Sequence, residues 1–152
     1  MTRLLTFIVL GLVMAFAPAL GEAKLKRLHV TTEIVQQAFT GDFDHPKLGD
    51  QLISSVTLSD KQAIVGTGAG VCTIVSVPQP PADGETLLQC LLTAVFDKQG
   101  QLIFGGVAPL PQPGVVAQFG ILGGTEDFRK ARGEATLVVL SPTLQDATFD
   151  LE

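Results

Sequence analysis

The sequence predicts an all-β fold, an eight-stranded antiparallel up-and-down β-barrel, on three observations. From about residue 28 onward, short runs rich in β-branched and apolar residues alternate with clusters of Gly, Pro and Asp, which is the pattern of strands separated by turns. No segment of helical period and useful length competes with this pattern. Eight successive strands with mostly short connections favour a barrel, because closure removes the unpaired edges of an open sheet.

The expected strands follow one another with little chain between them. In order, they cover residues 28–37, 51–59, 63–77, 86–96, 101–108, 115–122, 134–141 and 147–151. The separators carry residues that turns prefer, and the clearest are Asp60-Lys61-Gln62, 78–84, 97–100 and the proline-rich 109–114. No internal repeat, linker or second domain interrupts the series.

The first residues have the pattern of a secretory signal. Arg3 gives a weakly positive start, residues 4–17 form an apolar run, and small residues follow. A membrane-spanning helix needs about 20 apolar residues, so this run is too short for one. We therefore expect residues 1–23 to be a signal peptide cleaved after Ala23, and residues 24–152 to be one barrel domain, secreted or periplasmic, without stable membrane insertion. Cleavage a few residues earlier and a retained membrane anchor are the alternatives.

Charge and histidine content argue against two classes of function. The net charge is −5 at pH 7 and no basic stripe follows the short lead-in at residues 24–27, so a nucleic-acid partner is not expected. His29 and His45 are the only histidines and show no spacing typical of metal ligands. We therefore expect no metal site.

The glycine-rich run at residues 66–70 resembles part of a dinucleotide fingerprint. That motif needs a following helix to present its N-terminus to phosphate, whereas residues 71–77 are β-branched and strand-like. The chain also lacks the Gly-x-Ser-x-Gly motif of a nucleophile elbow. No cofactor and no nucleophilic serine are expected.

Cys72 and Cys90 are expected to form a disulfide. An even number of cysteines in an exported chain favours a bridge, and the two lie in strand-like runs on either side of residues 78–84. A hairpin that puts Cys72 opposite Cys90 also puts Ile74 opposite Leu88. The loop-entropy contribution of such a bridge is roughly 3 kcal/mol. A pair of buried free thiols and a reactive catalytic cysteine are the alternatives.

The alternation of side chains along each strand sorts the residues into two faces. We expect the short turns to place Leu58 opposite Ile64 and Phe96 opposite Leu102. The mostly apolar face that includes the cysteines is the expected barrel interior, with Leu52, Ser54, Val56, Leu58, Ile64, Gly66, Gly68, Gly70, Cys72, Ile74, Leu88, Cys90, Leu92, Ala94, Phe96, Leu102 and Phe104. The other face is partly polar but carries an apolar set that suits an oligomer interface, namely Ile53, Val65, Val71, Leu87, Leu91 and Ile103.

Three glycines at alternate interior positions favour a ligand cavity. Gly66, Gly68 and Gly70 leave space that core side chains normally fill, and an eight-stranded barrel is wide enough to hold one small ligand. We expect this pocket to be lined also by Ser54, Leu92 and Phe104 and to take a small hydrophobic molecule. The alternative is that the glycines only permit strand coiling against neighbouring leucines.

Two polar residues are the candidates for catalysis. Asp50, at the start of the second strand, would serve as acid or base if desolvation raised its pKa; its alternative role is to cap nearby backbone amides in a turn. Arg132 would anchor a ligand carboxylate or stabilise negative charge that develops in a cyclisation; its alternative role is to pair with Asp127 or Glu134. Ser54, Asp127 and Arg129 are by default hydrogen-bonding or solvated residues.

The segment GGTEDFRKARG, from Gly123 to Gly133, resembles a signature of the allene oxide cyclase and dirigent barrels, including their small secreted bacterial-type members. The chain departs from that signature at Glu126, where the family usually has a third glycine. The resemblance covers residues 49–141 and implies a calycin-like barrel, often trimeric. Paired cysteines in this setting also resemble those of the bacterial-type members.

The resemblance implies an exported barrel that holds a small hydrophobic substrate in one conformation and directs its cyclisation or isomerisation without a cofactor. Such catalysis relies on positioning and on exclusion of water, which suits a chain without a nucleophile motif. A non-enzymatic barrel that binds a hydrophobic ligand, and a dirigent-like barrel that steers radicals made by another enzyme, are the alternatives, because one fold hosts distinct activities.

Overall fold

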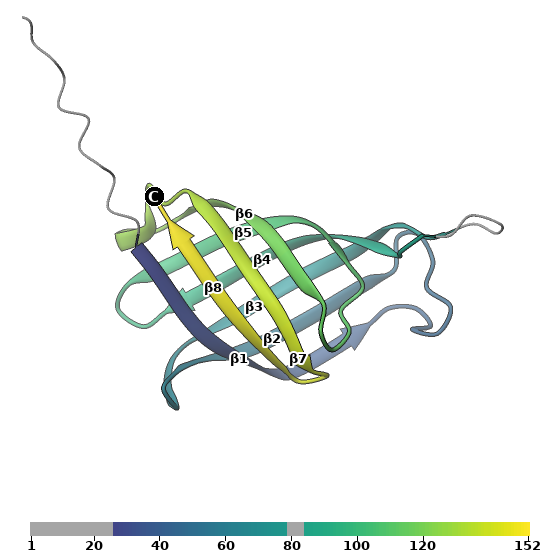
Figure 1. Cartoon of the computed structure of the whole chain (residues 1–152), viewed down its shortest axis with the longest axis horizontal. Helices are drawn as coiled ribbons and strands as arrows, with labels where there is room; N and C mark the ends of the chain where they lie inside the picture. The colour runs from purple at the N-terminus through teal and green to yellow at the C-terminus, as the bar shows by residue number, and fades with distance from the viewer. Residues whose placement is uncertain (1–25, 79–83) are drawn as a thin grey trace, which may run out of the picture.

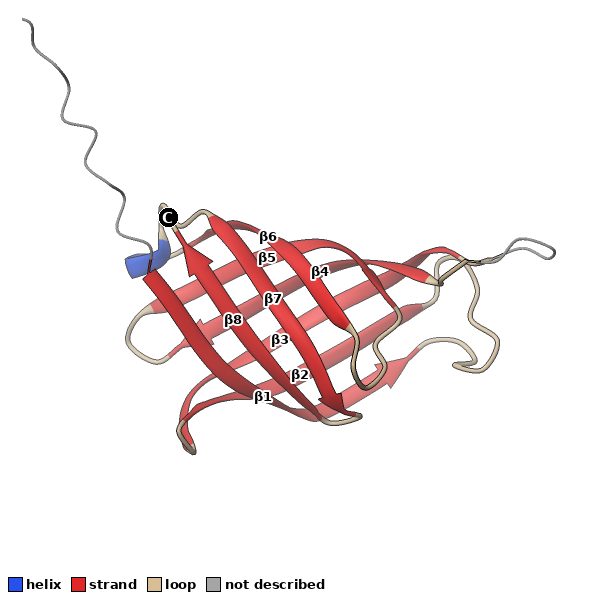
Figure 2. Ribbon diagram, in the orientation of Figure 1, coloured by secondary structure: helices blue, strands red, loops and turns tan. Residues whose placement is uncertain are grey.

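The computed structural model describes residues 26–78 and 84–152 and shows a closed antiparallel barrel of eight strands. Each strand pairs with its neighbours in the sequence, and β1 pairs with β8 (Figure 1; Figure 2). The strands are β1 (Lys26–Phe39), β2 (Gln51–Asp60), β3 (Ala63–Ser76), β4 (Leu87–Phe96), β5 (Gly100–Pro109), β6 (Val116–Gly124), β7 (Gly133–Ser141) and β8 (Leu144–Leu151). The predicted fold class is therefore confirmed, while the expected signal peptide, residues 1–23, lies outside the described residues.

The barrel has two different ends. The connections at 40–50, 110–115 and 142–143 lie at one end, which we call the mouth end. The turns at 61–62 and 97–99 and the short 3₁₀ helix η1 (Glu126–Phe128) lie at the other, the η1 end, together with the C-terminus (Figure 1). Across the described ranges, no helix is long and apolar enough to cross a membrane.

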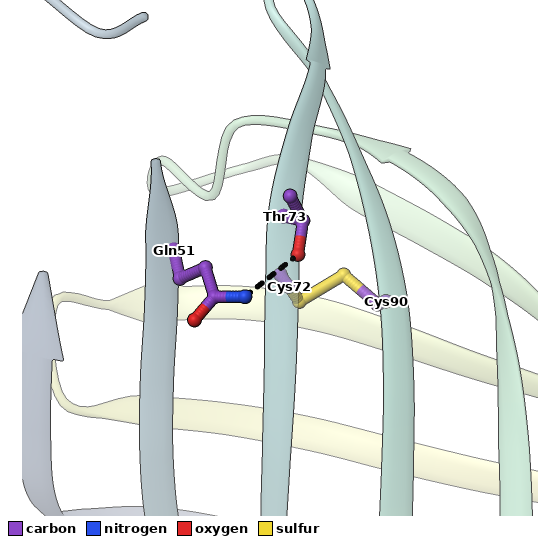
Figure 3. The surroundings of a disulfide bond; sticks show 4 residues. All are labelled: Gln51, Cys72, Thr73 and Cys90. Carbon is purple, nitrogen blue, oxygen red and sulfur yellow. Dashed lines mark hydrogen bonds between the residues drawn. A yellow bond between two sulfur atoms is a disulfide. The ribbon is translucent and has the colours of Figure 1, made fainter. Parts of the chain in front are cut away.

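The expected pairing of β3 with β4 is confirmed around the cysteines. Cys72 lies opposite Cys90 and Ile74 opposite Leu88, and a disulfide joins the two cysteines (Figure 3). On the neighbouring strand, the Gln51 amide donates a hydrogen bond to the Thr73 hydroxyl at 3.4 Å. The bridge fastens two adjacent strands near the mouth end of the barrel.

The turn between β2 and β3 differs from the expectation. Lys61 and Gln62 both have positive φ and form a two-residue hairpin loop of the kind whose twist matches the flanking strands. A bulge between Leu58 and Ser59 then moves the register by one more residue, so that Leu58 faces Gly66 and Ser59 faces Ile64. The expected interior position of Ile64 is therefore wrong: its side chain is 70% exposed on the outer face.

The turn between β4 and β5 is also tighter than expected. Phe96 lies opposite Gly100, and Leu102 lies opposite Ala94 rather than Phe96. This difference is two positions, and a shift of two keeps each side chain on its face. Leu102 and Phe104 are accordingly buried inside the barrel, as expected.

A cluster of phenylalanines closes the η1 end. The Phe128 ring, 1% exposed, lies 5.5 Å from the Phe96 ring, and the Phe149 ring lies 5.9 Å from Phe96 and 5.2 Å from Phe104, measured between centroids. The separations and tilted or edge-on geometries are those that aromatic pairs prefer. The Lys26 ammonium lies 5.3 Å from the Phe128 centroid on the outside. The segment that resembles the family signature thus supplies a plug.

Glu126, the departure from that signature, has a backbone that suits glycine. Its φ is +50°, in the left-handed region that costs a residue with a Cβ roughly 1 kcal/mol or more. We expect Glu126→Gly to raise the free energy of unfolding by about 0.5–1 kcal/mol, because relief of this cost exceeds the added freedom of the unfolded chain. Urea unfolding followed by circular dichroism measures the change. The matched variant Asp127→Gly is expected to destabilise, and a loss for Glu126→Gly as well would contradict the strain argument.

Pairing around the barrel is uneven. The ladder between β4 and β5 pairs ten positions, whereas the ladder between β5 and β6 pairs four, from Leu102 to Gly105 on β5. Residues 106–109 of β5 consequently have no ladder partner in β6 within the described chain. We call this stretch of the wall, residues 106–109 and 116–119, the β5–β6 seam.

Candidate functional site

Two adjoining cavities occupy the barrel interior. The mouth cavity, of about 90 Å³, is lined by side chains from all eight strands, with Leu52, Leu88 and Phe119 among them. The inner cavity, of about 60 Å³, lies deeper and reaches Phe104 and Phe149 of the phenylalanine cluster. Four residues line both cavities, namely Ser54, Leu92, Leu137 and Gln145. The two spaces therefore adjoin at these four residues, and the phenylalanine cluster closes the inner one; we call the two together the path.

A third space continues this path outside the barrel. The vestibule, of about 440 Å³, is lined by Phe43, three prolines and other residues of the mouth-end connections. It shares with the mouth cavity Ile34, Gln37, Pro111, Val139 and Gln145. Phe43 packs edge-on against Phe39, with centroids 5.3 Å apart. The path to solvent therefore runs over apolar and proline side chains and past the amides of Gln37, Gln112 and Gln145.

Two of the three interior glycines border the inner cavity. Gly68 and Gly70 line it, together with Ser54, Leu92 and Phe104, which were expected in the pocket. The space above each glycine is partly used, since a Cβ on Gly68 would lie 2.8 Å from a Val56 methyl carbon and one on Gly70 would overlap a Leu92 methyl carbon. Neighbouring side chains thus fill part of the room that the glycines leave.

Gly66 lies outside both cavity linings. A Cβ at this position would overlap the carbonyl oxygen of Val95 on β4. The absence of a side chain at Gly66 therefore lets the backbones of β3 and β4 approach closely near the η1 end. Gly66 was expected to line the pocket, and the structure places it in the barrel wall instead.

The disulfide belongs to the wall of the mouth cavity. Cys72 and Cys90 both line that cavity, and Cys90 is buried while Cys72 is partly buried. A disulfide is an apolar surface without an ionisable thiol. The sulfur atoms thus extend the apolar lining and supply no nucleophile.

Asp50 lies at the mouth end but lines neither cavity. Its carboxylate accepts a hydrogen bond from the backbone N–H of Lys47 at 2.8 Å and packs closely on Gly41. This is the capping arrangement, one of the two roles considered for Asp50. In the same connection, a hydrogen bond from His45 lowers the pKa of Asp42. The carboxylates of this connection stabilise its backbone and lie away from the cavity.

Arg132 lies at the η1 end, on the far side of the phenylalanine cluster from the cavity. Its exposed guanidinium donates a hydrogen bond to the carbonyl oxygen of Ala131 at 2.8 Å. Among the described side chains, neither Asp127 nor Glu134 forms an ion pair with it. Asp50 and Arg132 therefore lie at opposite ends of the barrel, and the structure does not bring them together around one substrate.

The polar groups that do line the path are amides and hydroxyls. Gln37, Ser54 and Gln145 line the mouth cavity, and Thr32 lines the inner one. No Asp, Glu, His, Lys or Arg of the described residues lines either cavity or the vestibule. Within the described ranges, no group of three or more His, Cys, Asp or Glu side chains is placed to hold a metal ion. The lining formed by these described residues can position a ligand and exclude water, and it includes no side chain that would act as a general acid or base.

Gln145 was not among the residues expected at the site, although the sequence contains a signal for it. Ala147, Phe149 and Leu151 are buried at alternate positions of β8. Extending that alternation by one step towards the N-terminus places Gln145 inside. The expected strand began only at residue 147, so this step was missed.

The sequence matches no protein-family model and no curated protein, whereas the fold matches solved structures closely. A pyocyanin demethylase superposes with a TM-score of 0.71 at 25% identity, over 84% of this chain and 100% of that one. An exo-specific intermolecular Diels-Alderase gives 0.70 at 16% identity, over 84% and 97%. The pterocarpan synthase dirigent protein gives 0.59 at 18% identity, over 84% and 88%.

These structures share with the chain a closed barrel over most of its described length. The segment from Gly123 to Gly133, which carries the sequence resemblance, forms the last part of β6, the η1 plug and the start of β7. The chain therefore shares the barrel fold of these solved structures, one of which is a dirigent protein.

Proposed function

We propose that this protein binds a small hydrophobic molecule in the barrel cavity and directs its cyclisation or isomerisation by holding it in one reactive conformation. The observation that carries the proposal is the lining of the path: it is mainly apolar, contains no ionisable side chain among the described residues, opens at the mouth end and is closed by the phenylalanine cluster. Such a site excludes water from the reacting part of a ligand.

A pericyclic cyclisation suits this lining. In a [4 + 2] ring closure, two carbon–carbon σ bonds form at the expense of π bonds, and no proton, nucleophile or leaving group is transferred. The protein then contributes by holding the diene and the alkene close together in one orientation, an effect that is worth up to roughly 7–11 kcal/mol in well-oriented systems. Two of the structurally similar proteins, a Diels-Alderase and a cyclase, are described as catalysing cycloadditions, and this supports the choice.

The volumes indicate how a ligand sits. Pockets for drug-sized ligands measure about 300–1,000 Å³, more than the mouth cavity of about 90 Å³ or the inner cavity of about 60 Å³. The vestibule of about 440 Å³ adds the missing space. We therefore infer that a slender part of the ligand enters the barrel while the remainder lies among the prolines of the vestibule.

A non-enzymatic hydrophobic-ligand-binding or dirigent-like barrel is the second candidate, and the lack of an acid or base in the lining that the structure describes favours it equally. Native mass spectrometry of the oxidised protein, exported through an oxidising compartment, provides the test. A defined apolar molecule bound to the barrel supports a ligand site. A second assay adds a linear molecule that carries a diene and an enone; its conversion into a ring indicates an enzyme, whereas binding without conversion indicates a ligand-binding protein. A barrel that carries no ligand and binds no apolar probe would contradict both candidates.

Filling the mouth cavity is expected to abolish ligand binding. Ala117 of β6 lines this cavity and is partly buried, so in Ala117→Leu the added carbons occupy the space of the ligand. We expect the affinity for trans-stilbene, an uncharged hydrocarbon probe measured by its fluorescence, to fall at least tenfold. The free energy of unfolding should change by less than about 1.5 kcal/mol, because the added volume enters a void.

The neighbouring residue provides the matched control. Gln118 is exposed on the outer face of the same strand, so Gln118→Leu adds a leucine without filling the cavity. It should bind trans-stilbene as the unaltered protein does. Equal losses in the two variants would place the binding site outside the barrel.

Export and trimer formation remain part of the proposal. A disulfide between Cys72 and Cys90 suits an oxidising compartment. The outer face exposes apolar side chains that an assembly would cover, including Ile53, Leu91, Val107 and Leu122. Native mass spectrometry reports subunit number in the same experiment, and an exclusively monomeric protein would count against the trimer.

A further inference from the structure

Gln145 is the one described side chain that borders all three spaces of the ligand path. It lines the inner cavity, the mouth cavity and the vestibule. On β8 it lies opposite Thr32 of β1 and Val139 of β7, and its backbone carbonyl oxygen accepts a hydrogen bond from the Thr32 hydroxyl at 3.4 Å. A ligand that extends from the inner cavity to the vestibule must therefore pass the Gln145 amide.

Two further polar side chains line the mouth cavity together with Gln145. Gln37 of β1 lies opposite Ser54 of β2, and both line the mouth cavity. Within the described part of the chain, the side chains of Gln37, Ser54 and Gln145 make no hydrogen bond to protein. The one side-chain bond of the described residues at this place is the Thr32 hydroxyl bond to the backbone carbonyl oxygen of Gln145, which leaves the Gln145 amide free. Their hydrogen-bonding capacity is available to a ligand.

The chemistry of this group restricts the ligand. Burying a carboxylate, phosphate or ammonium group is costly unless a charge of opposite sign pairs with it, and the described lining of the path offers no such charge. A glutamine amide presents two N–H donors and a carbonyl acceptor, so it can replace the hydration of a neutral carbonyl group. An apolar ligand with one neutral carbonyl group therefore pays the smallest desolvation cost when it enters the cavity.

We propose that Gln145 is a specificity-determining residue that donates a hydrogen bond to a carbonyl oxygen of the ligand, so that the barrel selects uncharged, carbonyl-bearing apolar molecules over hydrocarbons and over carboxylates. This inference rests on the proposed function, because it assigns the ligand class of the same cavity. For a cyclisation, a hydrogen bond to a carbonyl conjugated with the reacting alkene withdraws electron density from that alkene and fixes its orientation. Gln37 provides a second contact at the mouth.

Three matched probes test the ligand class. trans-Stilbene is a hydrocarbon, trans-chalcone has the same two rings joined through an enone, and stilbene-4-carboxylate adds a charge. We expect the unaltered protein to bind chalcone about three- to tenfold more tightly than stilbene, the range of one net hydrogen bond. The carboxylate should bind more weakly than either.

The variant Gln145→Met removes the amide and keeps the length and flexibility of the side chain. We expect the ratio of chalcone affinity to stilbene affinity to fall to about one, with stilbene affinity unchanged or increased. Gln112→Met is the matched control, because Gln112 borders the vestibule but neither inner space, and its ratio should equal that of the unaltered protein.

The outcomes separate the inference from the function on which it rests. If the unaltered protein binds both neutral probes but Gln145→Met leaves their ratio unchanged, the role of Gln145 is refuted and the cavity still binds ligands. If the unaltered protein binds neither, the cavity is not a site for apolar molecules and both conclusions are overturned.

The variant Gln145→Glu tests donation directly. An ionised glutamate accepts hydrogen bonds but donates none, so the ratio should fall at pH 8. Protonation restores a donor, and the ratio should recover as the pH falls through the pKa of the introduced carboxyl group, which lies at or above the usual value of about 4.3 in an apolar site. The unaltered protein should show no such change, and a low ratio in the variant at every pH would refute donation.

Discussion

Replacing Phe128 by alanine should lower the free energy of unfolding by about 3–5 kcal/mol, the usual range for a buried phenylalanine. The Phe128 ring is 1% exposed and packs 5.5 Å from the ring of Phe96, centroid to centroid. Its removal leaves a void at the η1 end that the closed sheet cannot collapse to fill. The chain contains no Trp or Tyr, so urea unfolding is best followed by far-ultraviolet circular dichroism.

A second phenylalanine provides the comparison for this variant. Phe43, at the mouth end, is 47% exposed, and Phe43→Ala should cost less than about 1 kcal/mol because little of its surface leaves water on folding. Equal losses for Phe43→Ala and Phe128→Ala would show that Phe128 has no special part in closing the barrel. Phe128→Leu, which keeps most of the apolar volume, should recover much of the stability.

The double variant Cys72→Ala with Cys90→Ala should lower the free energy of unfolding by about 2–4 kcal/mol. The bridge spans a sequence separation of 18 residues, and its loss increases the freedom of the unfolded chain. A more expanded unfolded state exposes more surface, so the denaturant dependence should also become steeper. Replacing both cysteines avoids leaving one reactive thiol in the cavity wall.

Chemical reduction of the unaltered protein checks the same contribution without a substitution. Reduced protein and the double variant should unfold at similar urea concentrations, both lower than the oxidised protein. An oxidised protein no more stable than the double variant would mean that native-state strain cancels the loop-entropy contribution. Ligand affinity should change in the double variant as well, because both cysteines line the mouth cavity.

Much of the fold follows from the sequence because hydrophobic alternation and turn residues are local signals. The eight strands and the facing of Cys72 and Cys90 were predicted and are confirmed. The register at the tight turns was not predicted correctly. A shift of two positions leaves every side chain on the same face of the sheet, so the alternation of apolar and polar residues does not reveal it. At Ile64 the error became visible, since a bulge between Leu58 and Ser59 turned that side chain outward.

The site was harder to predict, because it depends on which residues share an end of the barrel. In an up-and-down barrel, successive strands begin at alternate ends. Asp50 precedes an even-numbered strand, β2, and Arg132 precedes an odd-numbered one, β7, so strand counting alone separates them. The chemistry of a single residue does not say at which end of the barrel it lies. Gln37 and Gln145 belong to no known sequence motif, so nothing of that kind identified them as site residues.

The β5–β6 seam bears on how large a molecule the barrel can admit. Residues on both sides of the seam, including Ala108, Pro109, Ala117 and Phe119, form part of the mouth cavity wall, and the two strands are paired only from Leu102 to Gly105 on β5. Spreading the wall at this place breaks no ladder hydrogen bond between the two strands, whereas spreading it between β4 and β5 breaks several. The β5–β6 seam is therefore the part of the wall where widening costs the fewest ladder hydrogen bonds, and we expect a bulky ligand to be accommodated there first.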